Sequence, residues 1–141
     1  MQIIKKSDEN DILFKKAEVI ADNELQYYID LLQWHIDEVR VIWYGLALPQ
    51  INISKRWFLM VYKDIEMVIL NPKIVRKSWV KKRMTEWCLS IPWLKKDKVR
   101  SDVIAIEYID QNLVRQTHSF KGMLARIVQH EIDHLDWILI A

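Results

Sequence analysis

The N-terminal third of the chain contains an apolar stripe at helical spacing. Its members are three or four positions apart, namely Leu25, Tyr28, Leu32, Ile36 and Val39. This period gives a helix one apolar face, so we predict a helix over residues 23–38. Asp22 precedes the stripe and is a residue type that often caps a helix N-terminus, so we expect it to be the cap.

The centre of the chain consists of short β-rich segments separated by turn residues. Residues 57–62 and 66–70 are rich in aromatic and large apolar side chains, which favour strands. Lys63-Asp64 between them suits a hairpin turn, and we expect Asn71-Pro72 to end the second strand. The basic stretches at 73–83 and 95–100 are interrupted by apolar residues and are expected to be solvated faces.

The last third predicts two strands and a helix. Residues 103–109 form a candidate strand, 110–112 a turn, and 113–118 a strand that returns antiparallel. Ser119 is a candidate cap for a final helix that runs to about Leu135. The inward face of this helix is formed by Leu124, Ile127, Val128 and Leu135. The order of helix, strands and helix predicts an α+β fold rather than a parallel α/β sheet.

The composition is that of an ordinary globular protein. The 141 residues fit one domain, which we expect to span residues 1–141, and 51% of them are hydrophobic. The apolar runs are too short to cross a membrane and no secretory signal is visible, so we expect a cytoplasmic protein without a membrane partner. A net charge of +2 does not indicate a specific nucleic-acid partner, and the single cysteine, Cys88, excludes an internal disulfide.

The strongest local motif is HExxH, formed by residues 130–134 within the final predicted helix. Residues four apart lie one helical turn apart on the same face, so His130 and His134 can bind one metal ion. Glu131 then lies close enough to exchange a proton with a water molecule at that ion. The alternative is a solvated helix end with two surface histidines.

A third metal ligand is needed, and the residues alone leave several candidates open. These are Cys88, Glu86, Asp133 and Asp136. A lone cysteine is more often a small buried hydrophobic residue than a metal ligand. The HExxH motif therefore does not by itself select Cys88 as the third ligand.

Three segments, in this order, resemble the signature motifs of peptide deformylases. Residues 45–50 (GLALPQ) are similar to GxGLAAPQ, residues 86–90 (EWCLS) to EGCLS, and residues 129–135 (QHEIDHL) to QHExDHL. The resemblance implies antiparallel or mixed sheets packed around a central C-terminal helix that carries HExxH. It implies removal of the formyl group from the N-terminal methionine of nascent polypeptides, with release of formate. The chain ends soon after His134, so we expect a short form without the further C-terminal helix of many bacterial deformylases.

The resemblance also implies a role for each matched residue. Cys88, His130 and His134 would bind the metal, usually Fe²⁺, with Zn²⁺, Ni²⁺ or Co²⁺ as substitutes. A thiolate with two imidazoles suits several of these ions. Glu131 would be the general acid and base, while the Gln50 side-chain amide and the Leu89 backbone N–H would stabilise the oxyanion. The substrate pocket would be formed by Gly45, Leu46, Trp43 and Trp87.

The resemblance further implies which molecules the protein meets. We expect N-formylmethionyl nascent peptides as substrates, a transient contact with the ribosome, and a monomer. Two alternatives compete with this function. A zinc peptidase of the broad HExxH class would cleave internal peptide bonds, and a catalytically impaired deformylase-like protein would bind metal without turnover.

The sequence departs from the family in a regular way. It has 2 glycines and 7 tryptophans, where a usual glycine content of about 7% would give roughly 10 glycines. Tryptophan stands where the family often has glycine at Trp43, Trp79, Trp87, Trp93 and Trp137. Such glycines usually serve a positive φ or a close backbone approach. One hypothesis is divergence that narrows or blocks the pocket, and a second is that each tryptophan is an ordinary core or surface aromatic residue. The third, which the pattern favours, is a UGA codon that means glycine in the source and was translated as tryptophan.

Overall fold

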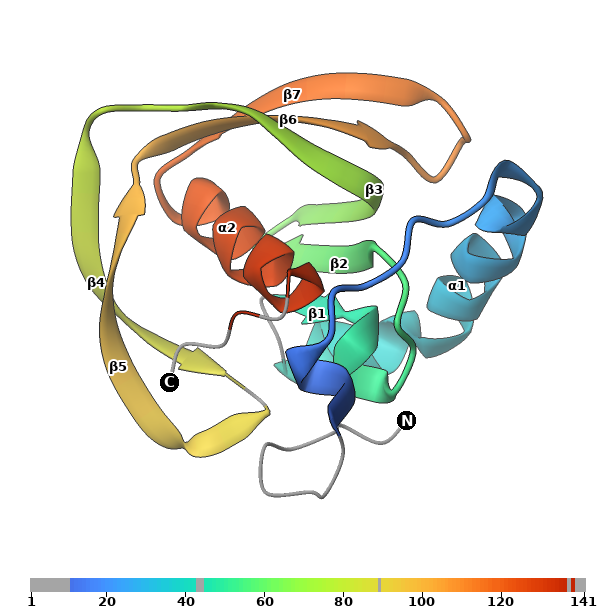
Figure 1. The fold of residues 1–141 in the computed structure, drawn as a ribbon, viewed down its shortest axis with the longest axis horizontal. Helices are drawn as coiled ribbons and strands as arrows, with labels where there is room; N and C mark the ends of the chain where they lie inside the picture. Colours follow the sequence, from blue (N-terminus) through green and yellow to red (C-terminus); the bar gives the residue numbers. More distant parts are fainter. Residues whose placement is uncertain (1–10, 43–44, 89, 137, 139–141) are drawn as a thin grey trace.

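The computed structural model describes residues 11–42, 45–88, 90–136 and 138. Its strands form a five-stranded sheet in the order β1-β2-β3-β6-β7 and a separate two-stranded sheet, β4-β5 (Figure 1). The pairings between these strands are antiparallel, which confirms the predicted α+β class. The elements are η1 (Asp11–Phe14), η2 (Asp22–Glu24), α1 (Leu25–Ile42), β1 (Gly45–Ala47), η3 (Leu48–Ile51), β2 (Trp57–Tyr62), β3 (Ile65–Lys77), β4 (Lys81–Cys88), β5 (Ile91–Ser101), β6 (Val103–Ile109), β7 (Arg115–Lys121) and α2 (Met123–Leu135).

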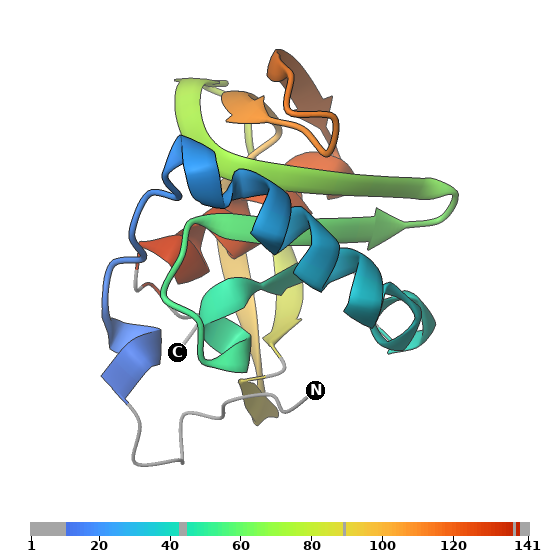
Figure 2. The same ribbon diagram turned by 90° about the vertical axis from the view of Figure 1, so that its right-hand side faces the viewer.

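Strand β2 lies between two layers of the core. Because successive side chains of a strand point to opposite faces, Phe58 and Met60 pack with α2, while Leu59 and Val61 pack with α1. Figure 2 shows α1 crossing the near side of β2 and β3, with α2 behind them. Both faces of β2 are therefore covered, which explains why this strand is an almost continuous apolar run. Among the described residues, no helix is both long and apolar enough to span a membrane.

The start of the first helix differs from the prediction. Asp22 is not its N-cap; it lies in η2, whose own N-cap is Ala21 without a side-chain hydrogen bond. The helix α1 follows directly and continues to Ile42, beyond the predicted end. Of the predicted apolar face, Leu25 and Tyr28 are buried as expected. The side chains of the other members, Leu32, Ile36 and Val39, lie outside the described part of the chain.

Strand β3 does not end at Asn71-Pro72 as predicted. It continues to Lys77, and its register with β6 shifts between Leu70 and Lys73. Asn71 has a φ of 50°, which asparagine tolerates better than most residues, and its side chain bonds the backbone N–H and C=O of Ile20 at 2.8 and 2.9 Å. A bulge is a place where a strand accepts proline, so the strand bends here without ending.

The last helix begins later than predicted. Ser119 lies in β7, so it is not a helix cap, and the N-cap of α2 is Gly122 with a φ of 63°. The predicted antiparallel hairpin of β6 and β7 is confirmed. Strand β7 covers residues 115–121 instead of the predicted 113–118, so it begins and ends a few residues later. The left-handed backbone of Gly122 allows the chain to leave the strand and enter the helix at once.

Strands β4 and β5 were not predicted. They form a two-stranded ribbon that curves past α2 and carries the second basic stretch and the end of the first, residues 81–83 (Figure 1). The stretches are solvated on one face, but Glu86 and Arg100 on the other face are buried at 7% exposure. Charged residues on the inward face remove the alternation of apolar and polar residues that identifies a strand.

Candidate metal centre

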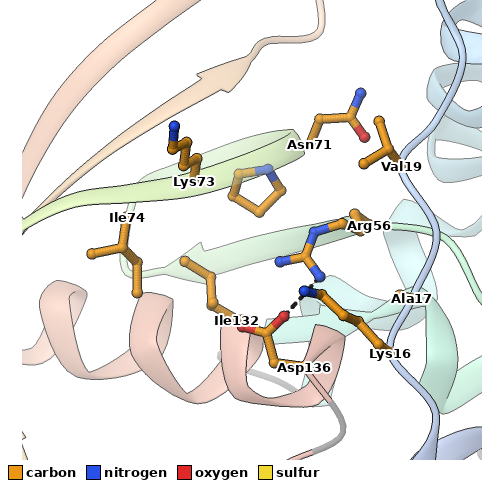
Figure 3. Close-up of a pocket in the computed structure, with 10 residues that line it drawn as sticks. Lys16, Ala17, Val19, Arg56, Asn71, Lys73, Ile74, Ile132 and Asp136 are labelled. Atoms are coloured by element: carbon orange, nitrogen blue, oxygen red, sulfur yellow. Dashed lines mark hydrogen bonds and ion pairs between the residues drawn. The ribbon is translucent and has the colours of Figure 1, made fainter.

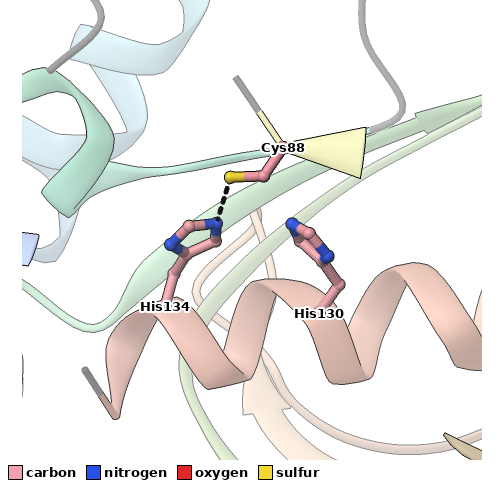
Figure 4. Close-up of side chains that lie close together, drawn as sticks. All are labelled: Cys88, His130 and His134. Carbon is pink, nitrogen blue, oxygen red and sulfur yellow. Dashed lines mark hydrogen bonds between the residues drawn. The ribbon is translucent and has the colours of Figure 1, made fainter. Parts of the chain in front are cut away.

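The helix α2 and the end of β4 bring three predicted ligands together. His130 and His134 lie one turn apart on α2, with ring centroids 5.0 Å from each other. The Cys88 sulfur lies 3.2 Å from His134 Nε2, and the ligand atoms of all three residues lie within 4.8 Å of one another (Figure 4). Cys88 is 1% exposed and His134 is 2% exposed, so these two ligands are buried.

The donor set fits a divalent transition metal. One cysteine sulfur and two imidazole nitrogens are ligands that zinc and iron accept, and three protein ligands leave a coordination position open. Burial, followed by the nearby charges of His130 and Arg100, lowers the pKa of His134 well below its usual value. His134 is therefore neutral and can offer a lone pair from Nε2.

His130 is oriented by an acidic neighbour. Its Nδ1 lies 2.9 Å from Glu86 Oε1, which leaves Nε2 for the cluster. Burial lowers the pKa of this imidazole, but its hydrogen bonds to Cys88 and Glu86 outweigh burial and raise the pKa to about 10. A bound metal would replace the proton at Nε2, because metal binding by histidine releases a proton.

The other three candidate ligands are engaged elsewhere. Asp133 accepts a hydrogen bond from Arg100 at 2.7 Å, and Asp136 accepts one from Arg56 at 2.8 Å. Glu86 is paired with His130 and with arginines. Only Cys88 adds a third donor atom to the histidine pair within the described residues.

Glu131 adjoins the cluster and is buried at 4% exposure. Burial raises the pKa of its carboxyl group to about 7, against the opposing charges of His130 and Arg100. Its Oε2 has no hydrogen-bond partner among the described residues. A Cβ atom at Gly45 would lie 2.8 Å from Glu131 Oε1, so the absence of a side chain at Gly45 makes room for this carboxylate.

Gln50 directs its amide group towards the same place. Its Oε1 accepts a hydrogen bond from the Ala47 N–H at 3.0 Å, which determines which end of the amide faces the cluster. The Nε2 group lies 3.9 Å from the Cys88 sulfur and 3.3 Å from Ser90 Oγ. Ser90, fully buried, was given no role from the sequence, although it belongs to the EWCLS segment that marked this region.

Not every predicted site residue points into the cluster. The Leu46 side chain lies in the core beneath α1, on the opposite face of β1 from Gly45. The Trp87 side chain is 45% exposed, whereas its neighbours Glu86 and Cys88 are buried. Leu89 and Trp43 lie outside the described residues.

A cavity of about 510 Å³ lies between residues 16–19, the middle of β3 and the C-terminal end of α2 (Figure 3). Its walls include Lys16, Lys73 and Ile132, together with the ion pair between Arg56 and Asp136. None of its lining residues belongs to the Cys88, His130 and His134 cluster.

Comparisons with known proteins agree with this arrangement. The family model of polypeptide deformylase matches residues 1–141. A peptide deformylase from Chlorobium luteolum is 34% identical over 139 residues, which cover 92% of this chain and 72% of that protein. One from Chlorobium phaeovibrioides is 42% identical over 102 residues, which cover 67% of this chain and 53% of that protein.

The fold has counterparts among solved structures. A class I type b peptide deformylase from Acinetobacter baumannii superposes with a TM-score of 0.88 at 30% identity, covering 99% of this chain and 96% of that one. Sequence and fold thus agree over the whole length of the chain, and it belongs to the polypeptide deformylase family.

Proposed function

We propose that this chain is a metal-dependent hydrolase that removes the formyl group from formyl-methionine at the N-terminus of nascent polypeptides. One observation carries the proposal: Cys88, His130 and His134 place their ligand atoms within 4.8 Å of one another, beside the buried carboxyl group of Glu131. We place the reaction in the cytoplasm, in one catalytic domain over residues 1–141 that acts as a monomer.

Cys88, His130 and His134 would hold the ion, Fe²⁺ natively and Zn²⁺, Ni²⁺ or Co²⁺ in a purified form. A divalent ion at such a site supplies a Lewis acid and lowers the pKa of water towards neutrality. The neutral His134 and the short distances between the three ligand atoms support this assignment.

Glu131 is the proposed general base and then general acid. Its carboxylate takes the proton of the attacking water and later gives it to the amine that leaves. A pKa of about 7 suits both roles, because a group that titrates near the working pH accepts and donates protons with similar ease.

Gln50 is the proposed side-chain donor to the oxyanion. Its Nε2 is directed at the cluster because its Oε1 is bonded to Ala47, so little reorganisation is needed when negative charge develops. The Leu89 backbone N–H is the proposed second donor, on the strength of the matched motif alone.

The formyl group is small, and a tight site can admit it while it excludes internal peptide bonds. We propose that Gly45, the backbone at Leu46 and the partly exposed Trp87 line this site. Trp43, outside the described residues, is assigned to the pocket on the strength of the matched motif alone. The matched family does not favour a general HExxH peptidase or an inactive metal-binding protein.

Formate release from a formyl-methionyl tripeptide tests the function. We expect Glu131→Gln to keep its metal and lose roughly 10²- to 10⁴-fold in turnover, because the amide cannot accept a proton. Gln50→Ala should lose about 10²-fold through loss of one oxyanion donor. Glu66→Gln, at an exposed glutamate of β3, is the matched control and should behave as the wild type. Near-normal turnover in Glu131→Gln, or cleavage of internal peptide bonds by the wild type, would contradict the proposal.

A further inference from the structure

The carboxylate of Glu86 receives four hydrogen bonds inside the protein. Its Oε2 accepts from Arg100 Nε and from Arg126 Nη1, each at 2.6 Å. Its Oε1 accepts from Arg100 Nη2 at 2.8 Å and lies 2.9 Å from His130 Nδ1. A carboxylate has about four lone-pair positions, so this one is fully used.

Because the lone-pair positions of the Glu86 carboxylate are all occupied, this group determines which ring nitrogen of His130 carries a hydrogen. Three of the four contacts of this carboxylate are to guanidinium N–H groups, which can only donate, so both of its oxygens already act as acceptors. The hydrogen between Glu86 and His130 is therefore on Nδ1, and Nε2 is the nitrogen that is left to face Cys88 and His134 and to bind a metal. A ligand histidine is usually oriented in this way by a partner of its other nitrogen.

Arg126 connects three parts of the fold at one point. It lies on α2 one turn before His130, and its Nη2 donates to the Lys82 carbonyl on β4 at 2.7 Å. Its Nη1 donates to the Lys98 carbonyl on β5 at 3.0 Å, in addition to Glu86. Arg100 makes the reciprocal connection, from β5 to Asp133 on α2 at 2.7 Å.

The cost of burying these charges argues against a purely structural role. Arg126 is 7% exposed and lies on α2 between the buried Ala125 and Ile127. Replacing a buried ion pair with apolar residues of similar volume is often neutral or stabilising. A gain in stability therefore does not explain an arginine at position 126. Its hydrogen bond to Glu86, which orients that carboxylate, does explain it.

We propose that Arg126 is a positioning residue of the metal centre. It holds Glu86 in the orientation that fixes His130, and it keeps the strand that ends in Cys88 in register with the helix that carries both histidines. The inference rests on the proposed function, because it takes Cys88, His130 and His134 as the ligands.

Cobalt binding tests the inference without reference to turnover. Titration of the metal-free protein with Co²⁺, against a competing chelator, gives the affinity, and the thiolate-to-cobalt charge-transfer band reports the Cys88 bond. We expect Arg126→Met to weaken Co²⁺ binding by about 10- to 100-fold and to change the spectrum at saturating metal. Arg126→Lys, which keeps one donor, should recover part of both. Arg83→Met, an exposed arginine of β4, is the matched control and should bind as the wild type.

A double-mutant cycle identifies the route of the effect. If Arg126 acts through Glu86, Arg126→Met should weaken Co²⁺ binding less in a Glu86→Gln background than in the wild type. Additive effects, or wild-type affinity and spectrum in Arg126→Met, would overturn the inference. If Arg126→Met does not fold, Arg126→Lys decides: weaker binding in a folded chain supports the inference, and wild-type binding or loss of folding overturns it. A wild-type protein that binds Co²⁺ without a thiolate band would instead overturn the proposed function.

Discussion

At Gly45 the backbone of β1 passes close to the carboxylate of Glu131, the proposed general base. A methyl group there would lie 2.8 Å from Glu131 Oε1 and 3.0 Å from its Cδ, closer than side chains normally approach. Either β1 or the carboxylate would have to move. The size of the residue at position 45 therefore controls the position of Glu131.

We expect Gly45→Ala to keep the metal and lose activity on the order of 10²-fold, because a displacement of about 1 Å in a reacting group costs that much. The measurement is kcat for formate release together with metal content. Gly122→Ala is the control, since no atom lies within 4 Å of its added Cβ, although its φ of 63° disfavours alanine. It should lose stability and keep kcat. Wild-type kcat in Gly45→Ala would show that Glu131 is free to move.

The tryptophans differ sharply in how the fold uses them. Trp57 is 2% exposed and belongs to the core beneath α1, whereas Trp79 is 100% exposed and Trp93 is 61% exposed. A positive φ, one of the two usual reasons for glycine, does not occur at Trp79, Trp87 or Trp93. Trp43 and Trp137 lie outside the described residues. The core thus packs around the indole of Trp57, whereas the indole of Trp79 lies fully exposed at the surface.

The recoding hypothesis stays a prediction, and the coding DNA tests it. We expect UGA at the codons for Trp43, Trp79, Trp87, Trp93 and Trp137, and UGG at Trp57. The protein offers a parallel measurement. Trp79→Ala should change the free energy of unfolding by no more than about 0.5 kcal/mol, whereas Trp57→Ala should cost about 3–5 kcal/mol. UGG at the five positions would leave divergence as the explanation.

At the scale of the element, Asn71 lets β3 continue through its bulge. Its side chain bonds both polar backbone groups of Ile20 and so ties the segment before α1 to the sheet. We expect Asn71→Ala to lower the free energy of unfolding by about 1–3 kcal/mol, because two backbone groups lose their partner and alanine disfavours a φ of 50°. Thermal unfolding measures this.

Asn112→Ala is the control for this change, since Asn112 lies in the exposed turn between β6 and β7. Its loss should be within about 0.5 kcal/mol. Equal losses in the two variants would mean that the bonds of Asn71 to Ile20 contribute nothing specific.

The elements with a clear pattern were predictable, and those with charged inward faces were not. Apolar runs and turn residues identified β2, the start of β3, β6 and most of α2. The ribbon of β4 and β5 was missed because Glu86 and Arg100 face inward, where a pattern of apolar residues is expected. In the site, the i, i+4 histidines followed from helix geometry. Cys88 needed the family motif, because its distance from them arises from the fold alone.

At the scale of the whole molecule, the metal should contribute to stability. The cluster buries Cys88, His134 and Glu131, and two of its polar atoms, Glu131 Oε2 and His134 Nδ1, have no partner among the described residues. An ion that binds only the folded chain adds about 2.7 kcal/mol at a hundred times its Kd. We expect a chelator to lower the Tm and added metal to restore it. Cys88→Ala should reduce the response to chelator, and an undiminished response would place the stabilising ion elsewhere.

The division of the strands into two sheets also determines which part of the protein is expected to unfold locally. Among the described residues, the ribbon of β4 and β5 shares no strand pairing with the five-stranded sheet, and it is held to α2 through Arg100, Arg126 and Gln129. We therefore expect it to detach as a unit while the rest remains folded, and Cys88, at the end of β4, to leave with it. Loss of the ion and local unfolding of the ribbon then become one coupled equilibrium. In hydrogen exchange, the amides of β4 and β5 should respond together to metal, while those of β2 should not.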